Sequence, residues 1–568
     1  MKLSARISLR VLFLICLSLS LWFGACKAVP AGRGTEEETT PADPQPAIEV
    51  SGESLQDYAE SRPRPKLKDE LVVAFSKSEL ELDFRKSYLA SEAQFFTAIY
   101  EGLFSYHPFT MEPVAAAASS WDLSEDKKEW TFTIRERAKF HNGDPLRAED
   151  FRAAWLSLLD PGRDSPYSSL FDIIEGARDF RLGKCSAKEV GISAPNERTL
   201  VVRLNAPAAF FPSMLCHHSF SPIHPSLVKE EVWTRPVSNG PFYISEYGNE
   251  LVLLKNSEYW DAGRVPLNKI TVKFTDDGDE AAALWNSGEA RWIHGDVNVE
   301  ALTDRSGIEV NAMFATYYYY IRSARKPWSD FRLRRALALV LPWQEIRKGH
   351  ALPAKTLIYP IPEYPKIEGL ENGDQQEAER LLAEAGYGGG AGLPELVIRI
   401  TPSQEAERIA TIMAGAWFEK LKIPVKIDVV PFRNYFQSLK QDDYDVGSTT
   451  WIGDFADPYT FLQMWCRDSN LNDARHNDND YEKLIEKSMT EEGTKRWETL
   501  AEAETLLLSR GNVLPISYSP ALNIIDLNEI DGWYPNVLDI HPFKYLTFKA
   551  LMPLPGVVIK PQREQLNS

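Results

Sequence analysis

The chain is organised around the stretch TTWIGDFADPYTFL, residues 449–462. It combines aromatic rings, a glycine and two carboxylates, Asp454 and Asp457, directly before a proline turn, and a strand-like run at residues 444–446 precedes it. A loop at the end of a strand is where an α/β protein presents polar groups to a ligand. The alternative is a turn in which the aspartates hydrogen-bond their own backbone, as is common in Asx-Pro sequences. Local chemistry favours the plain turn, and the rest of the chain reverses that preference.

Length and composition limit the class of protein. The 568 residues exceed what one hydrophobic core usually organises, so two or three lobes are expected. With 44% hydrophobic and 25% charged residues the composition is that of an ordinary globular protein, and the aromatic share of 11% suits a cavity lined with rings. The net charge of -18 argues against a nucleic-acid partner or an anionic lipid surface, because both need a basic face.

Residues 1–25 have the pattern of an export signal. Three cations precede the apolar run 11–23, which is too short to span a membrane, and the small residues Gly24 and Ala25 follow it. Cys26 comes next, and a cysteine in this place resembles the lipobox of bacterial lipoproteins, in which it is lipidated. We therefore expect residues 1–25 to be a lipoprotein signal peptide and Cys26 to carry the lipid. A plain secreted protein that is cut elsewhere is the alternative.

Residues 26–66 are rich in proline, glutamate, threonine and glycine and have no apolar period. Such a segment cannot bury enough surface to offset the entropy cost of ordering. We expect a disordered tether here, followed by a globular body that begins near residue 67.

Hydrophobic periodicity predicts strands and helices along the rest of the chain. Strands are expected at 70–75, 130–135, 199–204, 243–244, 270–274, 316–321, 395–400, 425–430 and 514–516. Helices are expected at 91–104, 148–159, 331–341, 377–385, 403–421, 481–489 and 497–508. The order strand, helix, strand over residues 395–430 indicates a βαβ-like unit and an α/β fold.

Two local patterns carry more specific expectations. In the run TYYYYI, residues 316–321, alternation places two rings on each face of a strand, so Tyr318 and Tyr320 are candidate cleft residues, with plain core packing as the equal alternative. Gly240, which precedes Pro241, is expected to use a positive φ at a crossover or hinge.

The segment Cys216-His217-His218, with His224 nearby, invites a metal interpretation. Prolines around it make it a loop, adjacent histidines do not share a face of a helix or strand, and no carboxylate partner or recognised ligand spacing accompanies them. We expect no metal site and no cofactor.

Six blocks follow one another along the chain: YEGLF at 100–104, NGDPLRAEDF at 142–151, SNGPF at 238–242, PWSDFRLRRAL at 327–337, AERLLAEAGY at 378–387 and WIGDFADPYTFL at 451–462. In this order they resemble the oligopeptide/dipeptide/nickel-binding receptors of bacterial ABC importers, solute-binding protein family 5. The resemblance covers about residues 67 to 550. It implies an α/β, periplasmic-binding-protein type II-like fold with two main lobes, a smaller extra domain and a hinged ligand cleft. We assign residues 67–110, 233–310 and 520–568 to lobe I, residues 111–232 to the extra domain and residues 311–519 to lobe II.

The same resemblance implies the site. In the family's peptide binders the aspartate of the last block takes the α-ammonium group of the peptide, which makes Asp454 the candidate here. Trp451 would supply a wall, and Ile452 and Gly453 would offer backbone groups for strand-like pairing. Some oligopeptide receptors carry an arginine six residues before this aspartate to meet the ligand carboxylate, and this chain has Ser448 instead. The preferred peptide length is therefore open.

The resemblance also implies partners and compartment. We expect a lipid-anchored, monomeric protein of the bacterial cell envelope, on its periplasmic or extracellular face, that passes an oligopeptide or dipeptide to ABC permease and ATPase subunits. Signatures of hydrolases and nucleotide-binding enzymes are absent from the sequence, and Asp454 and Asp457 lie too close along one loop to flank a sugar, so no catalytic residue is expected. Two alternatives remain: the same fold binding a nickel chelate, heme or sugar, and a secreted enzyme or adhesin that reuses the fold.

Overall fold

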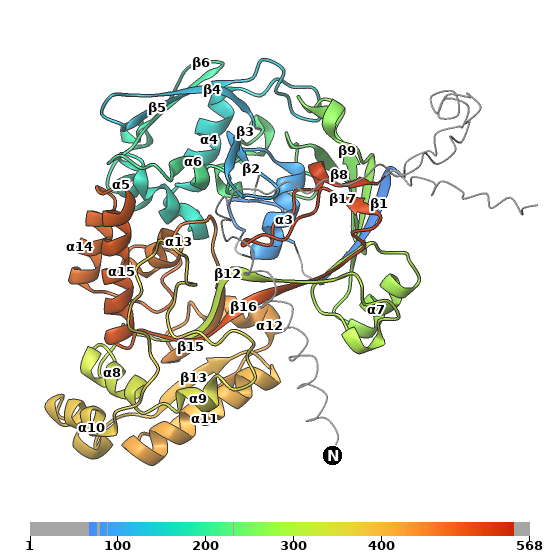
Figure 1. Ribbon diagram of the computed structural model, residues 1–568. Coiled ribbons are helices and arrows are strands. Elements are labelled where there is room, and N and C mark those ends of the chain that lie inside the picture. Colours follow the sequence, from blue (N-terminus) through green and yellow to red (C-terminus); the bar gives the residue numbers. More distant parts are fainter. Residues whose placement is uncertain (1–67, 77–79, 88, 231, 550–568) are drawn as a thin grey trace, which may run out of the picture. The chain divides into compact units, whose positions relative to one another are not determined.

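The computed structural model describes residues 68–76, 80–87, 89–230 and 232–549, all of which belong to the unit Leu67–Ser568 (Figure 1). The expected signal peptide at 1–25, the tether at 26–66 and the lipidation site Cys26 lie outside the described residues. Among the described helices, none has both the length and the apolar composition needed to cross a bilayer.

A ten-stranded mixed sheet is the central element. Its strand order is β14-β13-β15-β12-β16-β11-β1-β10-β9-β8. In that order the strands are β14 (Val425–Val429), β13 (Leu396–Ile400), β15 (Val446–Ile452), β12 (Ile308–Ile321), β16 (Val513–Ile525), β11 (Trp292–His294), β1 (Glu70–Phe75), β10 (Lys269–Phe274), β9 (Glu250–Lys255) and β8 (Phe242–Tyr247). The pairs β13–β14, β13–β15, β1–β10 and β1–β11 are parallel, which is typical of α/β folds.

The two long antiparallel strands β12 and β16, which we call the cross strands, join the two ends of this sheet (Figure 1). Their first pairing zone, from Ile308 to Ala312, adjoins β11, and their second, from Thr316 to Tyr320, adjoins β15. The register shifts between Ala312 and Thr316. A bulge of this kind bends a strand and increases its twist. The strands in the two halves of the sheet can therefore run at an angle to each other.

A series of helices follows β12 along the chain, and the longest of them packs on β13 and β14. They are α8 (Phe331–Leu339), α9 (Trp343–Ile346), α10 (Gln375–Glu384), α11 (Gln404–Leu421), α12 (Phe432–Ser438), α13 (Tyr459–Leu462), α14 (Asn479–Ser488) and α15 (Gly493–Ser509). Asp330 caps α8, with its side chain accepting from the Arg332 amide. The Trp417 indole of α11 is fully buried and donates to the Leu337 carbonyl of α8 at 2.9 Å, which ties two helices into a separate hydrophobic core.

The other half of the sheet carries α3 (Ala90–Ile99) and α7 (Gly278–Asn286). Short strand pairs join β2 (Phe104–Tyr106) to β3 (Pro113–Ala115) and β17 (Ile530–Asp531) to β18 (Thr547–Phe548). The predicted helix at 91–104 was too long, because Tyr100 leaves the helical conformation. The next residue, Glu101, is buried and accepts hydrogen bonds from Tyr259 and from Trp260, the latter at 2.6 Å, so the chain turns away from the helix axis to satisfy it.

A separate four-stranded antiparallel sheet has the order β4-β5-β7-β6. Its strands are β4 (Ala118–Leu123), β5 (Glu129–Ile134), β6 (Ile192–Asn196) and β7 (Thr199–Arg203), and the accompanying helices are α4 (Ala148–Leu158), α5 (Ala177–Arg181) and α6 (Phe211–Met214). Short 3-10 helices link these elements: η2 (Pro166–Ile173), η3 (Ala187–Glu189), η4 (His218–Phe220) and η5 (Pro225–Leu227). The strands and the helix predicted in this region are confirmed to within one or two residues.

Gly240 is needed for a reason other than the predicted positive φ. It is not among the residues with positive φ. A Cβ atom there would lie 2.4 Å from the Ile99 carbonyl carbon and 2.7 Å from the Ala98 carbonyl oxygen. The glycine therefore allows close approach of two backbone segments at the end of α3, and the prediction of a left-handed turn was wrong.

Candidate functional site

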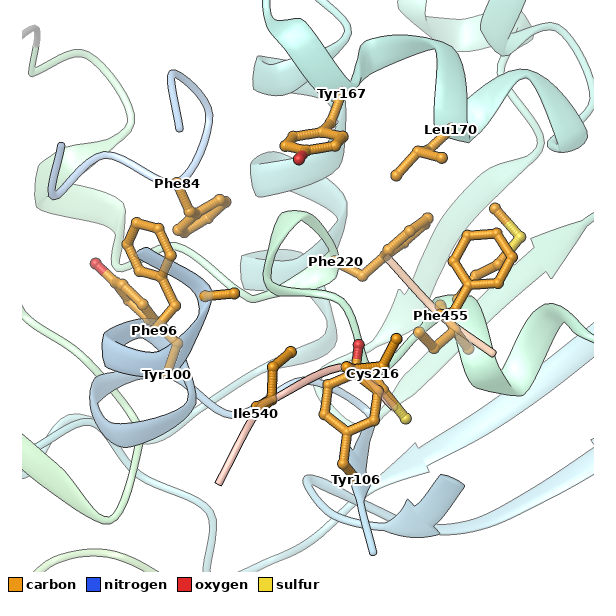
Figure 2. Close-up of a cluster of buried hydrophobic side chains, with 14 of the residues drawn as sticks. Phe84, Phe96, Tyr100, Tyr106, Tyr167, Leu170, Cys216, Phe220, Phe455 and Ile540 are labelled. Atoms are coloured by element: carbon orange, nitrogen blue, oxygen red, sulfur yellow. The ribbon is translucent and has the colours of Figure 1, made fainter. Parts of the chain in front are cut away.

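A cavity of about 130 Å³ lies where β15 meets α3, η2, η4 and the loop formed by residues 533–541. Its lining consists of Leu89, Ala93, Tyr167, His217, His218, Phe436, residues 449–454, Leu538 and Ile540. Figure 2 shows three sides of the surrounding cluster, with Phe96 on α3, Tyr167 on η2 and Ile540 on the 533–541 loop. Among the described residues of the lining, Asp454 is the one carboxylate, and none is a lysine or arginine.

Asp454 is held by a small set of hydrogen bonds. Its side chain accepts from the Thr460 hydroxyl at 2.9 Å, and its own amide donates to the same hydroxyl oxygen at 2.9 Å. The Tyr106 hydroxyl donates to the Asp454 carbonyl at 3.0 Å. Thr460 thus holds the Asp454 carboxylate and amide, and Tyr106 holds its carbonyl.

Among the described residues of the lining, the buried Asp454 carboxylate faces no fully charged cation. Burial raises the pKa of Asp454 to about 7, while hydrogen bonds from Thr460 and Tyr167 act in the opposite direction. The His217 Nε2 atom lies 3.7 Å from Asp454 Oδ1, but burial lowers the pKa of His217 to about 3, so this imidazole is neutral at physiological pH. A cationic ligand group at this position would supply the charge that the ionised carboxylate lacks.

The stretch around Asp454 differs from the prediction in one respect. Residues predicted as a loop from Thr449 onward belong to β15, which continues to Ile452, because β12 pairs with all of it. Trp451 is buried, and Ile452 is partly exposed at the cavity. A Cβ atom on Gly453 would lie 2.6 Å from the Phe314 ring, so only glycine fits where the chain leaves the strand.

Tyr318 and Tyr320 do not line the 130 Å³ cavity. They are 1% and 2% exposed, and the Tyr320 hydroxyl lies 2.9 Å from that of Tyr444. Both border a void of about 10 Å³ between β12 and residues 464–474. Their rings therefore form part of the packing behind β15.

Asp457 is more than the turn residue that the sequence suggested. Its carboxylate accepts from the Tyr459 amide at 2.9 Å, as a turn aspartate does, but it also pairs with Arg496 through two bonds of 2.7 and 2.9 Å. The pair is buried, and the Arg496 guanidinium lies 4.0 Å from the centre of the Phe210 ring. Asp457 thus fastens the loop after β15 to α15.

His217 and His218 both line the cavity, contrary to the reasoning that adjacent histidines point apart. They lie at the entrance to η4 rather than in a regular strand or helix, and their ring centres are only 4.0 Å apart. A carboxylate, Asp454, does approach His217, which the sequence could not indicate. Across the described residues, no group of three histidine, cysteine or acidic side chains is arranged to hold a metal ion.

A larger cavity of about 470 Å³ lies between η2 and α5 on one side and α13, η9 (Gln463–Trp465) and α14 on the other. Its arginines are already paired, Arg178 with Asp468 at 2.7 Å and Arg181 with Asp172 at 2.5 Å. The Arg178 pair, together with the bond of 2.7 Å that Arg181 donates to the Asp468 carbonyl, connects the region of the four-stranded sheet to the region after β15. We take the smaller cavity as the candidate site because it contains the Asp454 carboxylate.

Tyr167, Thr460 and His217 are neighbours of Asp454 that the sequence did not predict. Thr460 lies in the quoted stretch, six residues after Asp454. This closeness in the sequence was the one available signal that the two side chains meet. Tyr167 and His217 are more than 200 positions away from Asp454 along the chain, and only the fold brings them together.

Comparison with known proteins gives consistent results. Residues 112–473 match the model described as bacterial extracellular solute-binding proteins, family 5 Middle. The oligopeptide-binding protein OppA of Bacillus subtilis (strain 168) is 31% identical over 440 residues, which cover 72% of this chain and 80% of that protein.

Solved structures are also similar. The murein tripeptide binding protein MppA of Escherichia coli has a TM-score of 0.75 at 26% identity, over 85% of this chain and 98% of that one. The unliganded open form of MppA gives a TM-score of 0.60 at 25% identity, over 85% of this chain and 97% of that one. These likenesses confirm the predicted α/β fold of the periplasmic-binding-protein type II class.

Proposed function

Because the chain belongs to family 5 of the bacterial extracellular solute-binding proteins, we propose that it binds peptides in a closing cleft and delivers them to the permease of an ABC importer. The family consists of transport binding proteins, so the chain is a binding protein and not an enzyme. The relatives that match it include oligopeptide-binding and murein-peptide-binding proteins, which supports a peptide as the ligand.

The observation that carries the proposal is the buried Asp454 carboxylate. It lies in a largely apolar cavity, and no lysine or arginine is present in the described lining. A peptide α-ammonium group would bind between this carboxylate and the Tyr167 and His217 side chains. An ion pair with good hydrogen bonds can offset the loss of hydration of both charges, whereas either charge buried alone is costly.

Backbone pairing along β15 would hold the rest of the peptide. In an antiparallel strand, alternate residues direct their N–H and C=O groups to opposite edges. Gly453 donates to Phe314 of β12 at 2.8 Å, whereas the Ser448 amide donates to the Tyr435 hydroxyl at 3.0 Å on the other edge. Thr450 and Ile452 share the edge of Ser448, so their backbone groups are available to an added strand. Trp451 and Gly453 would shape the wall, and Tyr318 and Tyr320 would support it from behind.

We place the hinge of the cleft at the register shift of the cross strands near residues 312–316. This location agrees with the division of lobes I and II near residues 310 and 520 and with an extra domain at 111–232. Closure is supported by contacts between that extra domain and lobe II, such as Arg178 with Asp468. The higher similarity to MppA than to its unliganded open form also favours a closed arrangement.

Attachment and delivery complete the proposal. A lipid on Cys26 would hold the monomer at the membrane, residues 26–66 would act as the tether, and the loaded receptor would dock on the permease. The cell envelope as its location agrees with the extracellular character of the family.

Isothermal titration with Ala-Ala-Ala and N-acetyl-Ala-Ala-Ala tests the ammonium site. Acetylation removes the ligand charge, and Asp454→Asn removes the protein charge, so each should weaken binding by about 100-fold or more. Acetylation should cause little further loss in the variant. Asp122→Asn, on the exposed strand β4, is the matched control and should bind as the wild type does.

Equal affinity for the free and acetylated peptides would exclude the proposed role of Asp454. Mass spectrometry of the ligand that co-purifies with the protein is the complementary measurement. A metal chelate, heme or sugar in place of a peptide would favour the same fold with a different ligand class.

A further inference from the structure

His218 is buried beside the proposed ammonium site in a position that ring packing alone does not explain. Its side chain lines the 130 Å³ cavity, and the residue is 7% exposed. The ring stacks on Phe96, with centres 4.8 Å apart and planes at 25°, and meets the Tyr167 ring edge-on at 5.8 Å. These contacts fix the orientation of the imidazole.

Both ring nitrogens of His218 are buried without a hydrogen-bond partner among the described residues. His217 differs, because its Nδ1 atom accepts from the Ser219 amide at 3.4 Å and its Nε2 atom faces Asp454. A buried polar atom that makes no hydrogen bond costs about 1–3 kcal/mol. A phenylalanine at position 218 would stack on Phe96 in the same way without that cost.

The imidazole of His218 is neutral in this environment. Burial, and secondarily the neighbouring His217, hold the pKa of His218 well below its ordinary value. A neutral imidazole offers one donor and one acceptor and does not repel a nearby ammonium group. The neutral His218 imidazole can therefore hydrogen-bond a ligand group that is polar and uncharged.

We propose that His218 determines specificity for the first residue of the ligand by hydrogen-bonding a hydroxyl or carboxamide on its side chain. This inference rests on the proposed binding of the ligand ammonium at Asp454. The His217 ring connects the two places, because its Nε2 atom is 3.7 Å from Asp454 and its centre is 4.0 Å from that of His218. A hydroxyl two bonds beyond the ligand Cα, with a hydrogen bond at each end, spans roughly 8 Å, a reach of the same order as these two distances taken together.

The peptides Thr-Ala-Ala and Val-Ala-Ala provide the test, because their first side chains have nearly the same shape and differ in one hydroxyl. Titration calorimetry with the wild type should give about 10-fold tighter binding of Thr-Ala-Ala. In His218→Phe the ratio of the affinities for Thr-Ala-Ala and Val-Ala-Ala should fall to about 1. The affinity for Val-Ala-Ala should stay within about threefold of the wild-type value. His224→Asn, at a cap outside the cavity, should keep the wild-type ratio.

Equal affinities in the wild type, or an unchanged ratio in His218→Phe, would overturn the inference. A uniform loss for both peptides in the variant would also overturn it, since that result indicates a structural or backbone-binding role. N-acetyl-Thr-Ala-Ala separates the two proposals: if it binds as well as the free peptide, the ammonium site fails while the threonine-to-valine ratio still reports on His218. Failure of both free tripeptides to bind would overturn both.

Nitrogen NMR of ¹⁵N-histidine-labelled wild-type protein is the second measurement and does not depend on the variant folding. Binding of Thr-Ala-Ala should shift the His218 ring nitrogens toward hydrogen-bonded values, and binding of Val-Ala-Ala should leave them unchanged. Identical shifts with both peptides would contradict the proposal.

Discussion

Replacing Asp454 with asparagine should shift the ligand-free protein toward its closed arrangement. In the present arrangement, which we propose is the closed one, burial raises the pKa of Asp454 to about 7, and opening of the cleft would hydrate the carboxylate and return the pKa toward its ordinary value of 3.8. The closed form therefore binds the proton more tightly than the open form. By linkage, closure without ligand becomes less favourable as the pH rises from about 4 to 7 and is constant above that range.

The size of the effect follows from the two pKa values. Near pH 8 the ionised carboxylate disfavours the ligand-free closed form by about 4 kcal/mol, and near pH 5 by about 2 kcal/mol. Asparagine keeps a carbonyl oxygen for the Thr460 hydroxyl and carries no charge, although its amide must also find a partner. We expect Asp454→Asn to favour closure by at least 10-fold at pH 8, and by clearly less at pH 5.

Electron spin resonance distance measurements check this prediction. Nitroxide labels at Ser193 and Glu419, both exposed, report the separation of the extra domain from lobe II, in a background where Cys185, Cys216 and Cys466 are serine. Wild type should open as the pH rises from about 4 to 7, and Asp454→Asn should stay closed. Identical distance distributions in the two proteins at pH 8 would refute the reasoning, as would a larger difference at pH 5 than at pH 8.

Three further substitutions test other parts of the site. Gly453→Ala should lower the unfolding free energy by about 1–3 kcal/mol in urea, because its methyl group would overlap a buried phenylalanine ring, and an unchanged midpoint would contradict this. Arg496→Met should cost about 3–5 kcal/mol in thermal unfolding by leaving the Asp457 carboxylate buried alone, whereas a neutral effect would show that the pair is dispensable. Arg178→Ala removes a partly exposed contact with Asp468, so peptide release measured by stopped flow should accelerate only about two- to fivefold and converge with wild type at high salt. Equal release rates at low salt would argue against a role of this contact in closure.

Local sequence patterns predicted the regular elements well because each pattern is a direct consequence of burial. The βαβ unit of β13, α11 and β14 follows from apolar periodicity, and α11 begins within one residue of the predicted start, with Ser403 as its cap. Errors occurred where a distant contact decides the conformation. The end of α3 depends on Glu101 meeting Tyr259 and Trp260, about 160 residues further along the chain, and no local pattern contains that information.

In the candidate site, too, local patterns indicated residues close in the sequence and did not indicate contacts from distant parts of the chain. The motif predicted Asp454 as the acid because its neighbours in the sequence match a known binding block. Tyr167, His217 and His218 were not predicted, since they reach Asp454 through η2 and η4, which belong to a different sheet region. The two tyrosines of β12 were placed in the cleft by alternation alone, which separates the faces of a strand but does not say which face is covered.

The cross strands also determine when the protein can complete its fold during synthesis. β12 pairs with β16, about 200 residues later in the chain, and β16 in turn pairs with β11 beside the N-terminal strand β1. The two halves of the central sheet cannot be joined until β16 has left the ribosome, so the chain remains without its central pairing for most of its translation. Such long-range pairing is slow to form, which leaves time for chaperone binding before the two halves join.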